Sequence, residues 1–244
     1  MRVPSVAPCG AVPWVPSNEV QRGNGIGETH EEGGKLHLSE ELMVKPEELM
    51  TYERQLLDKG YRYICGVDEV GRGPLAGPVT CTAVIMDLSD LIDGVNDSKK
   101  VSKKKREKLF DVIKSKAIAV STVSYDNHKI DEMNILNATK ACMGEAIMSL
   151  DVKPDIVIVD ALQLDIPYKT FGIIHGDALS YSIASASIIA KVTRDTYMEQ
   201  MALEYPQYDF EHNMGYGTAK HIAALKEYGA TPIHRKSFIG NFVK

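Results

Sequence analysis

The sequence predicts one α/β domain built on a mixed β-sheet, with a helical part at its C-terminal end. Three β-prone runs come first, at residues 61–68, 79–86 and 117–125, and helical and strand-like patterns alternate after them. The first two runs are close enough along the chain to pair antiparallel. The short apolar run DIVIVD, at residues 155–160, has the flanks of a buried strand. Together these patterns favour a mixed sheet over a purely antiparallel one.

The first 49 residues are expected to form a mostly disordered N-terminal extension. They are rich in Gly, Pro, Ser and Glu and show no sustained period of 2 or 3.6. A short helix is expected from Pro46, because proline suits a first helical position and Glu47 and Glu48 suit a helix N-terminus. This helix would end at Gly60.

Helical periodicity predicts four further helices, and one more short strand is expected near residues 170–174. The helices would span residues 102–116, 129–150, 182–205 and 218–228. Pro154 and Pro206 follow the second and third of these helices, and Gly229 is a suitable C-cap for the last. The basic tail after Gly229 is expected to be irregular.

The composition is that of a soluble globular protein. The 244 residues are 44% hydrophobic and 25% charged. No apolar run approaches the roughly 18 residues that a membrane span needs, and prolines interrupt the N-terminal stretch where a signal peptide would be continuously apolar. The four cysteines show no CxxC spacing, which argues against a zinc ribbon or a thioredoxin-type centre. We therefore expect a cytoplasmic protein whose cysteines are buried side chains.

The charge is unevenly distributed along the chain. The net charge is −5, but the first fifty residues hold eight of the 33 acidic and only four of the 28 basic side chains, so the remainder is close to neutral. The run from Ser98 to Lys108 concentrates seven basic side chains. Residues 103–108 could simply form a solvated helix face, whereas Lys99 and Lys100 precede the helix and are better placed to reach a phosphate.

Four acidic residues stand at the ends of predicted strands or at the starts of loops. Asp68 and Glu69 close the first strand, and Asp160 and Asp177 occupy similar positions later in the chain. Adjacent strand residues point to opposite faces, so the first two can serve one site only near a strand end. Four converging carboxylates would hold two Mg²⁺ or Mn²⁺ ions. Each acid could instead be a helix cap or a solvated loop residue.

The loop after Glu69 reads VGRGPLAGP and exposes its backbone. Glycines allow close approach, and one arginine suggests a phosphate ligand. The spacing GxGxxxG, with Pro74 and Pro78 where a helix should open, does not fit a dinucleotide-binding turn. The loop is not a P-loop either, because the GK[ST] ending is missing.

The histidines offer little to a functional hypothesis. His212 and His221 have no metal-type spacing, and His234 is expected to be exposed in the tail. Lone histidines are more often structural or solvent-facing than ligands.

Seven blocks of sequence, in order, closely resemble the bacterial type 2 ribonucleases H, the ribonuclease HII family. The resemblance covers about residues 52–238. The blocks are GVDEVGRGPLAGPV, DSKK, IDEMNILNATKACM, VDA, GDALSYSIASASIIAKVTRD, GYGTAKH and HRKSF. Agreement of seven separate blocks in type and order makes the resemblance highly specific.

The resemblance implies a ribonuclease H-like fold, with a five-stranded mixed sheet flanked by helices and a small helical C-terminal segment. Residues 50–205 would form the catalytic domain, and residues 206–244 would pack on it as a helical segment and tail. The family's catalytic, metal-binding acids carry over onto Asp68, Glu69, Asp160 and Asp177.

The resemblance also implies how the substrate is held. Gly71, Arg72 and Gly73 would read a ribose 2′-hydroxyl at an RNA to DNA junction. Tyr216 would pack on the next deoxyribose, and Lys99 would meet a backbone phosphate. Two departures stand out: relatives commonly carry a lysine where His175 stands, and SFIGNF lacks the proline usual after SF.

The implied activity is that of an endoribonuclease acting with two Mn²⁺ or Mg²⁺ ions and leaving 3′-hydroxyl and 5′-phosphate ends. Its substrates would be RNA/DNA hybrids and ribonucleotides embedded in duplex DNA, with no membrane partner, and the protein would be a monomer serving DNA repair and replication. Two alternatives stay open. A nuclease or recombinase of the same wider fold would attack DNA without a 2′-hydroxyl, and a hybrid-binding module would not cleave at all.

Overall fold

The protein, described here from a computed structural model, is built on one five-stranded β-sheet with strand order β3-β2-β1-β4-β5. The structure describes residues 45–160 and 162–243, so nearly all of the predicted N-terminal extension lies outside the described residues. The strands are β1 Ile64–Val70, β2 Val79–Met86, β3 Ala117–Tyr125, β4 Ile156–Asp160 and β5 Thr170–Ile173.

The sheet is mixed, as predicted. β2 pairs antiparallel with β1 and with β3, whereas β4 pairs parallel with β1 and with β5. The central strand β1 therefore joins an antiparallel half to a parallel half. In a sheet of this kind, the carboxyl ends of parallel strands open a crevice where a site can form.

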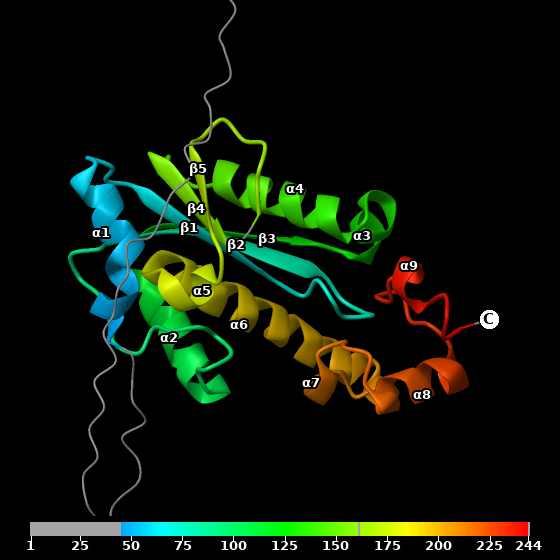
Figure 1. Ribbon diagram of the computed structural model, residues 1–244. Helices are drawn as coiled ribbons and strands as arrows, with labels where there is room; N and C mark the ends of the chain where they lie inside the picture. The colour runs from blue at the N-terminus through cyan, green and yellow to red at the C-terminus, as the bar shows by residue number, and fades with distance from the viewer. Residues whose placement is uncertain (1–44, 161, 244) are drawn as a thin grey trace, which may run out of the picture. The chain divides into compact units, whose positions relative to one another are not determined.

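Helices cover both faces of the sheet. Figure 1 shows α3 and α4 on one face and α2 and α6 on the other. The helical elements are η1 Pro46–Met50, α1 Thr51–Asp58, α2 Lys103–Lys116, α3 Asn127–Met133, α4 Ile135–Met148, α5 Gly176–Leu179, α6 Tyr181–Glu204, η2 Pro206–Tyr208, α7 Phe210–Asn213, α8 Ala219–Tyr228 and α9 Lys236–Ile239. In the described ranges, no helix has the length and apolar character needed to cross a membrane.

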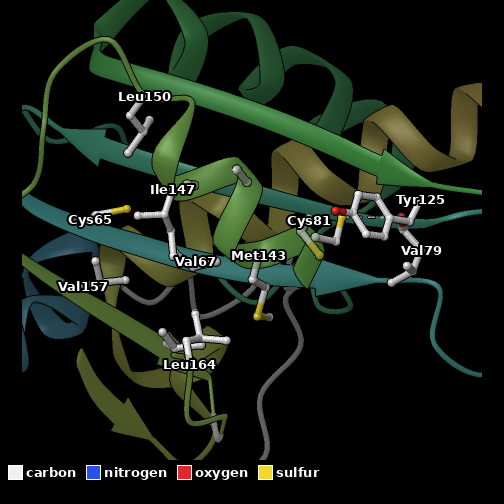
Figure 2. Packing of buried hydrophobic residues seen from close by; sticks show 14 of the residues in the cluster. Cys65, Val67, Val79, Cys81, Tyr125, Met143, Ile147, Leu150, Val157 and Leu164 are labelled. Atoms are coloured by element: carbon white, nitrogen blue, oxygen red, sulfur yellow. Dashed lines mark hydrogen bonds between the residues drawn. The ribbon is translucent and has the colours of Figure 1, made fainter. Parts of the chain in front are cut away.

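The largest core cluster lies between the sheet and α4. Cys65 and Val67 of β1 face Met143 and Ile147 of α4 there, as Figure 2 shows. Burial of such side chains contributes about 25 cal/mol per Å² of apolar surface. Cys65, Cys81 and Cys142 are all buried with free thiols, which confirms that these cysteines are core side chains.

Several predicted elements are confirmed nearly to the residue. β2 and β3 have the predicted bounds, and α2 begins one residue after Ser102, which is its N-cap. β1 differs, because it begins at Ile64 and continues to Val70 rather than spanning residues 61–68. The extra residues pair with β2, whose antiparallel register reaches Val70–Thr80.

The predicted helix 129–150 is wrong in one respect, since the segment forms two helices. α3 ends at Met133, and Asn134 adopts a left-handed backbone with φ of +64° before α4 begins. With ψ of 160° this conformation is sparsely populated for a residue with a Cβ, and the Asn134 side chain accepts a hydrogen bond from the Asn137 amide as an N-cap. The apolar spacing continues through the break, so periodicity alone does not show it.

Two short helices occur where irregular chain was expected. α7 lies in the polar segment before α8, and α9 lies in the tail, each only four residues long. One helical turn is too short to show a period of 3.6 residues. Both pack in a C-terminal cluster around Met198, Tyr208, Phe210, Leu225 and Ile239.

A buried glutamate ties the first helix to the start of α6. Glu53 is fully buried, and its Oε1 accepts hydrogen bonds from the Ser180 hydroxyl (2.6 Å) and the Ser182 amide (2.9 Å). Within the described part of the chain, Glu53 Oε2 and the Ser182 hydroxyl have no hydrogen-bond partner. Burial raises the pKa of Glu53 above its usual range.

We expect Glu53→Gln to remove part of the pH dependence of stability. Because its pKa is raised on folding, the Glu53 carboxyl binds its proton more tightly in the folded state, so its contribution to stability is lost as the pH rises. Glutamine keeps the acceptor and adds a donor beside Ser182, so its melting temperature should fall less between pH 5 and pH 8 than that of the wild type. Glu53→Ala should cost about 2 kcal/mol or more, because buried donors lose their acceptor. Thermal melts across this pH range measure both, and equal pH slopes for wild type and Glu53→Gln would contradict the assignment.

Candidate active site

The first two acids lie near the carboxyl end of the central strand. Asp68 and Glu69 are consecutive residues of β1, opposite Thr82 and Cys81 of β2. Because β1 continues to Val70, their side chains leave the strand on opposite faces, and the expectation that the chain is already leaving the sheet here is wrong. Space for a site arises here instead because the neighbouring strand β4 ends beside these acids.

Strand β4 ends beside these acids. Val67 pairs with Val159, so Asp160, the last residue of β4, lies level with Asp68. Glu69 thus lies past the end of β4, at the edge where the two parallel strands finish. The charge of Asp160 contributes to raising the pKa of both Asp68 and Glu69. These three carboxylates are therefore within electrostatic reach of one another.

The fourth acid is held close to the third by a short helix. The Gly176 amide at the start of α5 donates a 3.0 Å hydrogen bond to Asp160 Oδ1, and Asp177 is the next residue. His175, just before, has a left-handed backbone with φ of +59° that turns the chain into α5. Asp177 is buried, and its Oδ2 lies 3.0 Å from Lys99 Nζ.

Lys99 reaches the site from the loop before α2. Its own amide donates to Asp97 Oδ1 (3.0 Å), and Arg106 of α2 donates to the Ser98 carbonyl (2.9 Å). The hydrogen bond to Asp177, with the nearby charges of Asp97 and Asp68, raises the pKa of the Lys99 ammonium. This is the loop position predicted for a phosphate contact, and Lys99 here contacts an acid of the site.

The acids repel one another in a poorly solvated place. Burial raises the pKa of Asp68 well above its usual range, and the Glu69 and Asp160 charges raise it further. Burial also raises the pKa of Glu69, although Arg72 Nη1, 3.4 Å from Glu69 Oε1, opposes this. Such a cluster is stabilised by bound cations, because each added positive charge relieves repulsion that water does not screen.

The acids do not form a ready-made coordination shell. Within residues 45–160 and 162–243, no three acidic, histidine or cysteine side chains are close enough together to hold a metal ion as they stand. The structure brings the four predicted acids to one end of the sheet, with Lys99 on one of them. Their donor chemistry fits Mg²⁺ or Mn²⁺, which prefer carboxylate oxygens.

Two serines link Asp68 to the lysine loop, and the sequence did not single out Ser187, the one that contacts Asp68. The Ser187 hydroxyl of α6 hydrogen-bonds to the Asp68 carboxylate and lies 2.9 Å from the Ser98 hydroxyl. Ser98 precedes Lys99, so this chain of hydroxyls connects the acid of β1 to the lysine loop through α6. Both serines are buried. Their role depends on tertiary contacts between residues 89 positions apart, which no local pattern reveals.

The glycine loop lies directly after the acids. Gly71 is buried with φ of +91°, whereas Arg72 and Gly73 are exposed. A Cβ at Gly71 would lie 2.2 Å from Arg194 Nε and 2.6 Å from the Pro78 carbonyl oxygen. A Cβ at Gly73 would meet only the Tyr216 ring, at an ordinary 3.5 Å. The loop thus presents an arginine and a bare backbone to solvent beside the acids.

Two buried arginines hold this loop by its carbonyl groups. Arg235 donates to the carbonyl oxygens of Arg72 (2.9 Å), Gly71 (2.6 Å) and Gly77 (2.8 and 3.0 Å). Arg194 donates to the carbonyls of Pro78 (2.8 Å), Ala76 (3.2 Å) and Met214 (2.9 Å). Burial lowers the pKa of Arg235 to about 9, with Arg194 adding to the effect.

These arginines hold the loop in one conformation and place two buried positive charges against its backbone. With several carbonyl oxygens directed inward to guanidinium groups, the loop's conformation is set before any ligand arrives. Both residues stand inside the blocks KVTRD and HRKSF, but their burial and their partners could not be deduced from spacing.

Tyr216 lies against the same loop. Its side chain is 45% exposed, and its ring is the nearest group to the Gly73 position. The preceding residue, Gly215, accepts hydrogen bonds from the amides of Leu75 (2.8 Å) and Ala76 (3.4 Å). The structure therefore brings the predicted tyrosine and the predicted glycine loop together, although they are more than 140 residues apart in the chain.

The expectation that His234 is exposed is wrong. His234 and His221 are both buried, and their Nε2 atoms are 2.9 Å apart. His234 is held inside because its backbone pairs with Ala76 of the glycine loop and its carbonyl accepts from Asn127 Nδ2. His212, by contrast, is exposed.

Comparison with known proteins gives a consistent result along most of the chain. The family model described as Ribonuclease HII matches residues 65–241. The ribonuclease HII of Ruminiclostridium cellulolyticum is 50% identical over 203 residues, which are 83% of this chain and 80% of that protein. The ribonuclease HII of Acetivibrio thermocellus is 52% identical over 197 residues, covering 80% of this chain and 77% of that protein.

Solved structures agree with the fold. The ribonuclease H2 of Pyrococcus horikoshii superposes with a TM-score of 0.62 and 29% sequence identity, covering 72% of this chain and 93% of that one. The likeness confirms the ribonuclease H-like fold, with its five-stranded mixed sheet between helices.

Proposed function

The chain belongs to the ribonuclease HII family, and on this basis we propose that it cuts RNA in RNA/DNA hybrids and 5′ of ribonucleotides embedded in duplex DNA. Membership makes the protein a ribonuclease H, a hydrolytic nuclease that acts on RNA paired with DNA. The observation that carries the finer proposal is the meeting of two features at one end of the sheet. Acids near the carboxyl ends of β1 and β4 lie next to a glycine loop that faces Tyr216.

The family depends on divalent metal, and we propose that two Mn²⁺ or Mg²⁺ ions bind this chain during catalysis. Asp68, Glu69, Asp160 and Asp177 would hold them. Asp68, Glu69 and Asp160 are buried or half-buried acids within electrostatic reach of one another, and Asp177 follows the Gly176 amide that donates to Asp160. When bound, such ions would supply activation of water and neutralisation of charge on the leaving 3′ oxygen. The products would carry 3′-hydroxyl and 5′-phosphate ends.

The chain's own side chains would bind and orient the nucleic acid. Arg72 is exposed beside the acids, and Gly73 lets the backbone approach a sugar with no Cβ in between. The 2′-hydroxyl is the group that distinguishes RNA from DNA locally, so reading it at this loop would give the specificity. Lys99 would exchange its contact with Asp177 for a phosphate of the substrate as the acids take up cations.

We expect divalent cations to stabilise the folded protein through these acids. Adding Mn²⁺ at about 100 times its dissociation constant should add about 2.7 kcal/mol to the free energy of unfolding. Asp177→Asn should lose most of this gain, because one ligand and one charge are removed. Thermal melts with Mn²⁺ and with chelator measure the effect. Asp151→Asn is a control at an exposed position, and we expect Mn²⁺ to stabilise it as much as the wild type. An undiminished stabilisation of Asp177→Asn by Mn²⁺ would contradict the assignment.

We expect Tyr216→Ala to harm one substrate more than the other. A ring that packs on the deoxyribose after the cut matters most where the RNA consists of one residue, because a long hybrid can be cut at many positions. Loss of a stacking contact of about 1–3 kcal/mol corresponds to roughly a tenfold or larger fall in kcat/KM on duplex DNA with one ribonucleotide. Steady-state kinetics on both substrates measure this, and an equal fall on both would count against junction reading.

The whole proposal is tested by one cleavage assay. Duplex DNA carrying a single ribonucleotide is incubated with Mg²⁺ or Mn²⁺, beside a long RNA/DNA hybrid and an all-deoxy duplex. We expect cuts 5′ of the ribonucleotide and in the hybrid, and none in the all-deoxy duplex. Cleavage of the all-deoxy duplex would favour a DNA nuclease or recombinase, and metal-independent binding without cleavage would favour a hybrid-binding module. A role in removing ribonucleotides from DNA in the cytoplasm, as a monomer, is part of the same proposal.

A further inference from the structure

A pair of buried imidazoles lies behind the tyrosine of the site. His221 of α8 is 0% exposed and His234 of the C-terminal segment is 2% exposed, and 2.9 Å separates their Nε2 atoms. Within the described residues, no side chain of the four acids or of the glycine loop hydrogen-bonds to either imidazole. The proposed nuclease chemistry therefore leaves these two titratable groups without a role.

The surrounding hydrogen bonds allow one proton arrangement. The Thr231 amide can only donate, so His234 Nδ1, 2.9 Å away, accepts, and a neutral His234 carries its proton on Nε2. That proton points at His221 Nε2, which must accept it. His221 then carries its proton on Nδ1, 2.9 Å from the Tyr216 carbonyl oxygen, which can only accept. A single directed chain thus runs from Thr231 through both rings to the Tyr216 backbone.

The pair is kept neutral by its surroundings. Burial lowers the pKa of His221, and burial together with His221 lowers the pKa of His234 to about 4. Aromatic rings of Tyr208 and Phe210, from η2 and α7, pack around both imidazoles at centroid distances of 5.2–6.1 Å.

The polar groups near the pair carry no negative charge. The Tyr208 hydroxyl donates to the Gly229 carbonyl, and Asn127 of α3 donates to the His234 carbonyl. Arg235, the residue after His234, and Arg194 direct their guanidinium groups to the backbone carbonyls of Gly71 and Met214. Of the hydrogen bonds that the described residues make to either imidazole, none comes from a carboxylate.

Tyr216 depends on its backbone for its position. Its ring is nearly half exposed and touches the open side of the loop at Gly73, so packing restrains it on one side only. Its carbonyl accepts from the Thr218 amide (2.8 Å) and from His221 Nδ1 (2.9 Å), and its amide donates to the Asn213 carbonyl (2.8 Å). Of these contacts, the imidazole is the one made by a side chain, and it ties the Tyr216 carbonyl to the buried histidine pair.

We propose that His221 and His234 are positioning residues that, as a neutral pair with one fixed direction of hydrogen bonding, hold the Tyr216 backbone so that its ring stays beside Gly73. The inference rests on the proposed function for the purpose of that ring, which is to contact the substrate sugar. Protonating His221 at Nε2 sets two N–H groups against each other at 2.9 Å and breaks the chain between the rings. A proton on His234 Nδ1 opposes the Thr231 amide, 2.9 Å away, and leaves only the Thr231 hydroxyl to accept it. The complete chain of hydrogen bonds is therefore that of the neutral pair.

The first test reads the protons directly and needs no activity. In ¹⁵N-labelled full-length protein at pH 7, two-bond ¹H–¹⁵N spectra should show His221 as the Nδ1–H tautomer and His234 as the Nε2–H tautomer. A coupling across the Nε2–H···Nε2 contact should be visible, and both rings should stay neutral at pH 6. The reverse tautomers, or a protonated ring at pH 7, would overturn the proposal.

The second test distinguishes a positioning role from a general structural role. It compares two substitutions of His221 by amide side chains of similar size. His221→Asn keeps a donor at the Nδ1 position, toward Tyr216, whereas His221→Gln keeps a group at the Nε2 position and loses that donor. We expect His221→Gln to raise KM for the single-ribonucleotide duplex about tenfold with little change in kcat, and His221→Asn to restore KM to within about threefold. Nuclear Overhauser contacts between the Tyr216 ring and Gly73 should weaken in His221→Gln and persist in His221→Asn.

Equal behaviour of the two variants in KM and in the Tyr216 to Gly73 contacts would overturn the positioning role. If neither the wild type nor a variant cuts any RNA-containing substrate, the proposed function fails, while the tautomers and the Tyr216 contacts still decide the inference. If His221→Gln does not fold, the wild-type tautomers keep the proposal open to refutation.

Discussion

Asp68→Asn should reduce cleavage of every RNA-containing substrate by roughly 10³-fold or more, the order of loss seen when one group that stabilises a transition state is removed. Asp68 would hold the cations together with the other three acids, and an amide oxygen without charge is a much weaker ligand. Binding of an uncleaved hybrid should change little, since Lys99, Arg72 and Tyr216 are untouched. Single-turnover kinetics and a binding titration, both with Mn²⁺, measure the two effects.

The same substitution should make the metal-free protein more stable. Burial and the charges of Glu69 and Asp160 raise the pKa of Asp68, so the ionised carboxylate destabilises the fold as the pH rises through the folded pKa. Asn removes that repulsion, and the melting temperature at pH 8 with chelator should rise. Asp151→Asn, at an exposed position, should change neither activity nor melting temperature. Near-normal turnover by Asp68→Asn would remove Asp68 from the catalytic residues.

Most of the sheet could be predicted because its strands are short, apolar runs between strong turn signals. β2 and β3 follow from runs such as VTCTAVIM, and the mixed character follows from one early hairpin combined with later helix and strand alternation. Local pattern was sufficient for β2 because it lies between loops rich in Gly, Pro or charge. It failed at Asn134, because an asparagine with φ of +64° interrupts a helix without interrupting the apolar spacing.

The site was predictable in its residue types and much less so in its support. The four acids and the glycine loop stand out in the sequence. Carboxylates that follow buried strands, and glycines that follow carboxylates, rarely occur together within a short stretch. Ser187, Arg194 and Arg235 do not stand out, since a serine or arginine inside a helix or tail is usually solvated. Only the tertiary fold shows that these arginines are buried and donate to loop carbonyls. The same is true of His234, whose burial depends on Ala76 far earlier in the chain.

The contrast between Gly71 and Gly73 shows how the loop divides its work. The two glycines are separated only by Arg72, yet Gly71 is buried against Arg194 and Gly73 is exposed. Gly71 therefore belongs to the framework that shapes the loop, and Gly73 belongs to the exposed surface that we propose meets the substrate. Substitution of each by alanine separates the two roles.

Gly71→Ala should destabilise the protein by about 3 kcal/mol and abolish most activity. Its φ of +91° is unfavourable for any residue with a Cβ, and that Cβ would lie 2.6 Å from the Pro78 carbonyl oxygen, which is backbone and cannot move aside cheaply. Relief requires the loop to shift, and Arg235 would then lose its alignment with the Gly71 and Arg72 carbonyls. Denaturant unfolding measures the loss, and a change below about 0.5 kcal/mol would show that the loop is not held as described.

Gly73→Ala is the matched case, and it should leave stability within about 0.5 kcal/mol of the wild type, because its Cβ meets only the Tyr216 ring at 3.5 Å. The methyl group instead occupies the open surface where a ribose would have to approach. We expect kcat/KM on the single-ribonucleotide duplex to fall roughly 10- to 100-fold at an unchanged melting temperature, since one misplaced contact of 1–3 kcal/mol gives this range. Wild-type kinetics in Gly73→Ala would mean that the sugar is read elsewhere, whereas a large loss of stability would mean that Gly73 belongs to the arginine-held framework as Gly71 does.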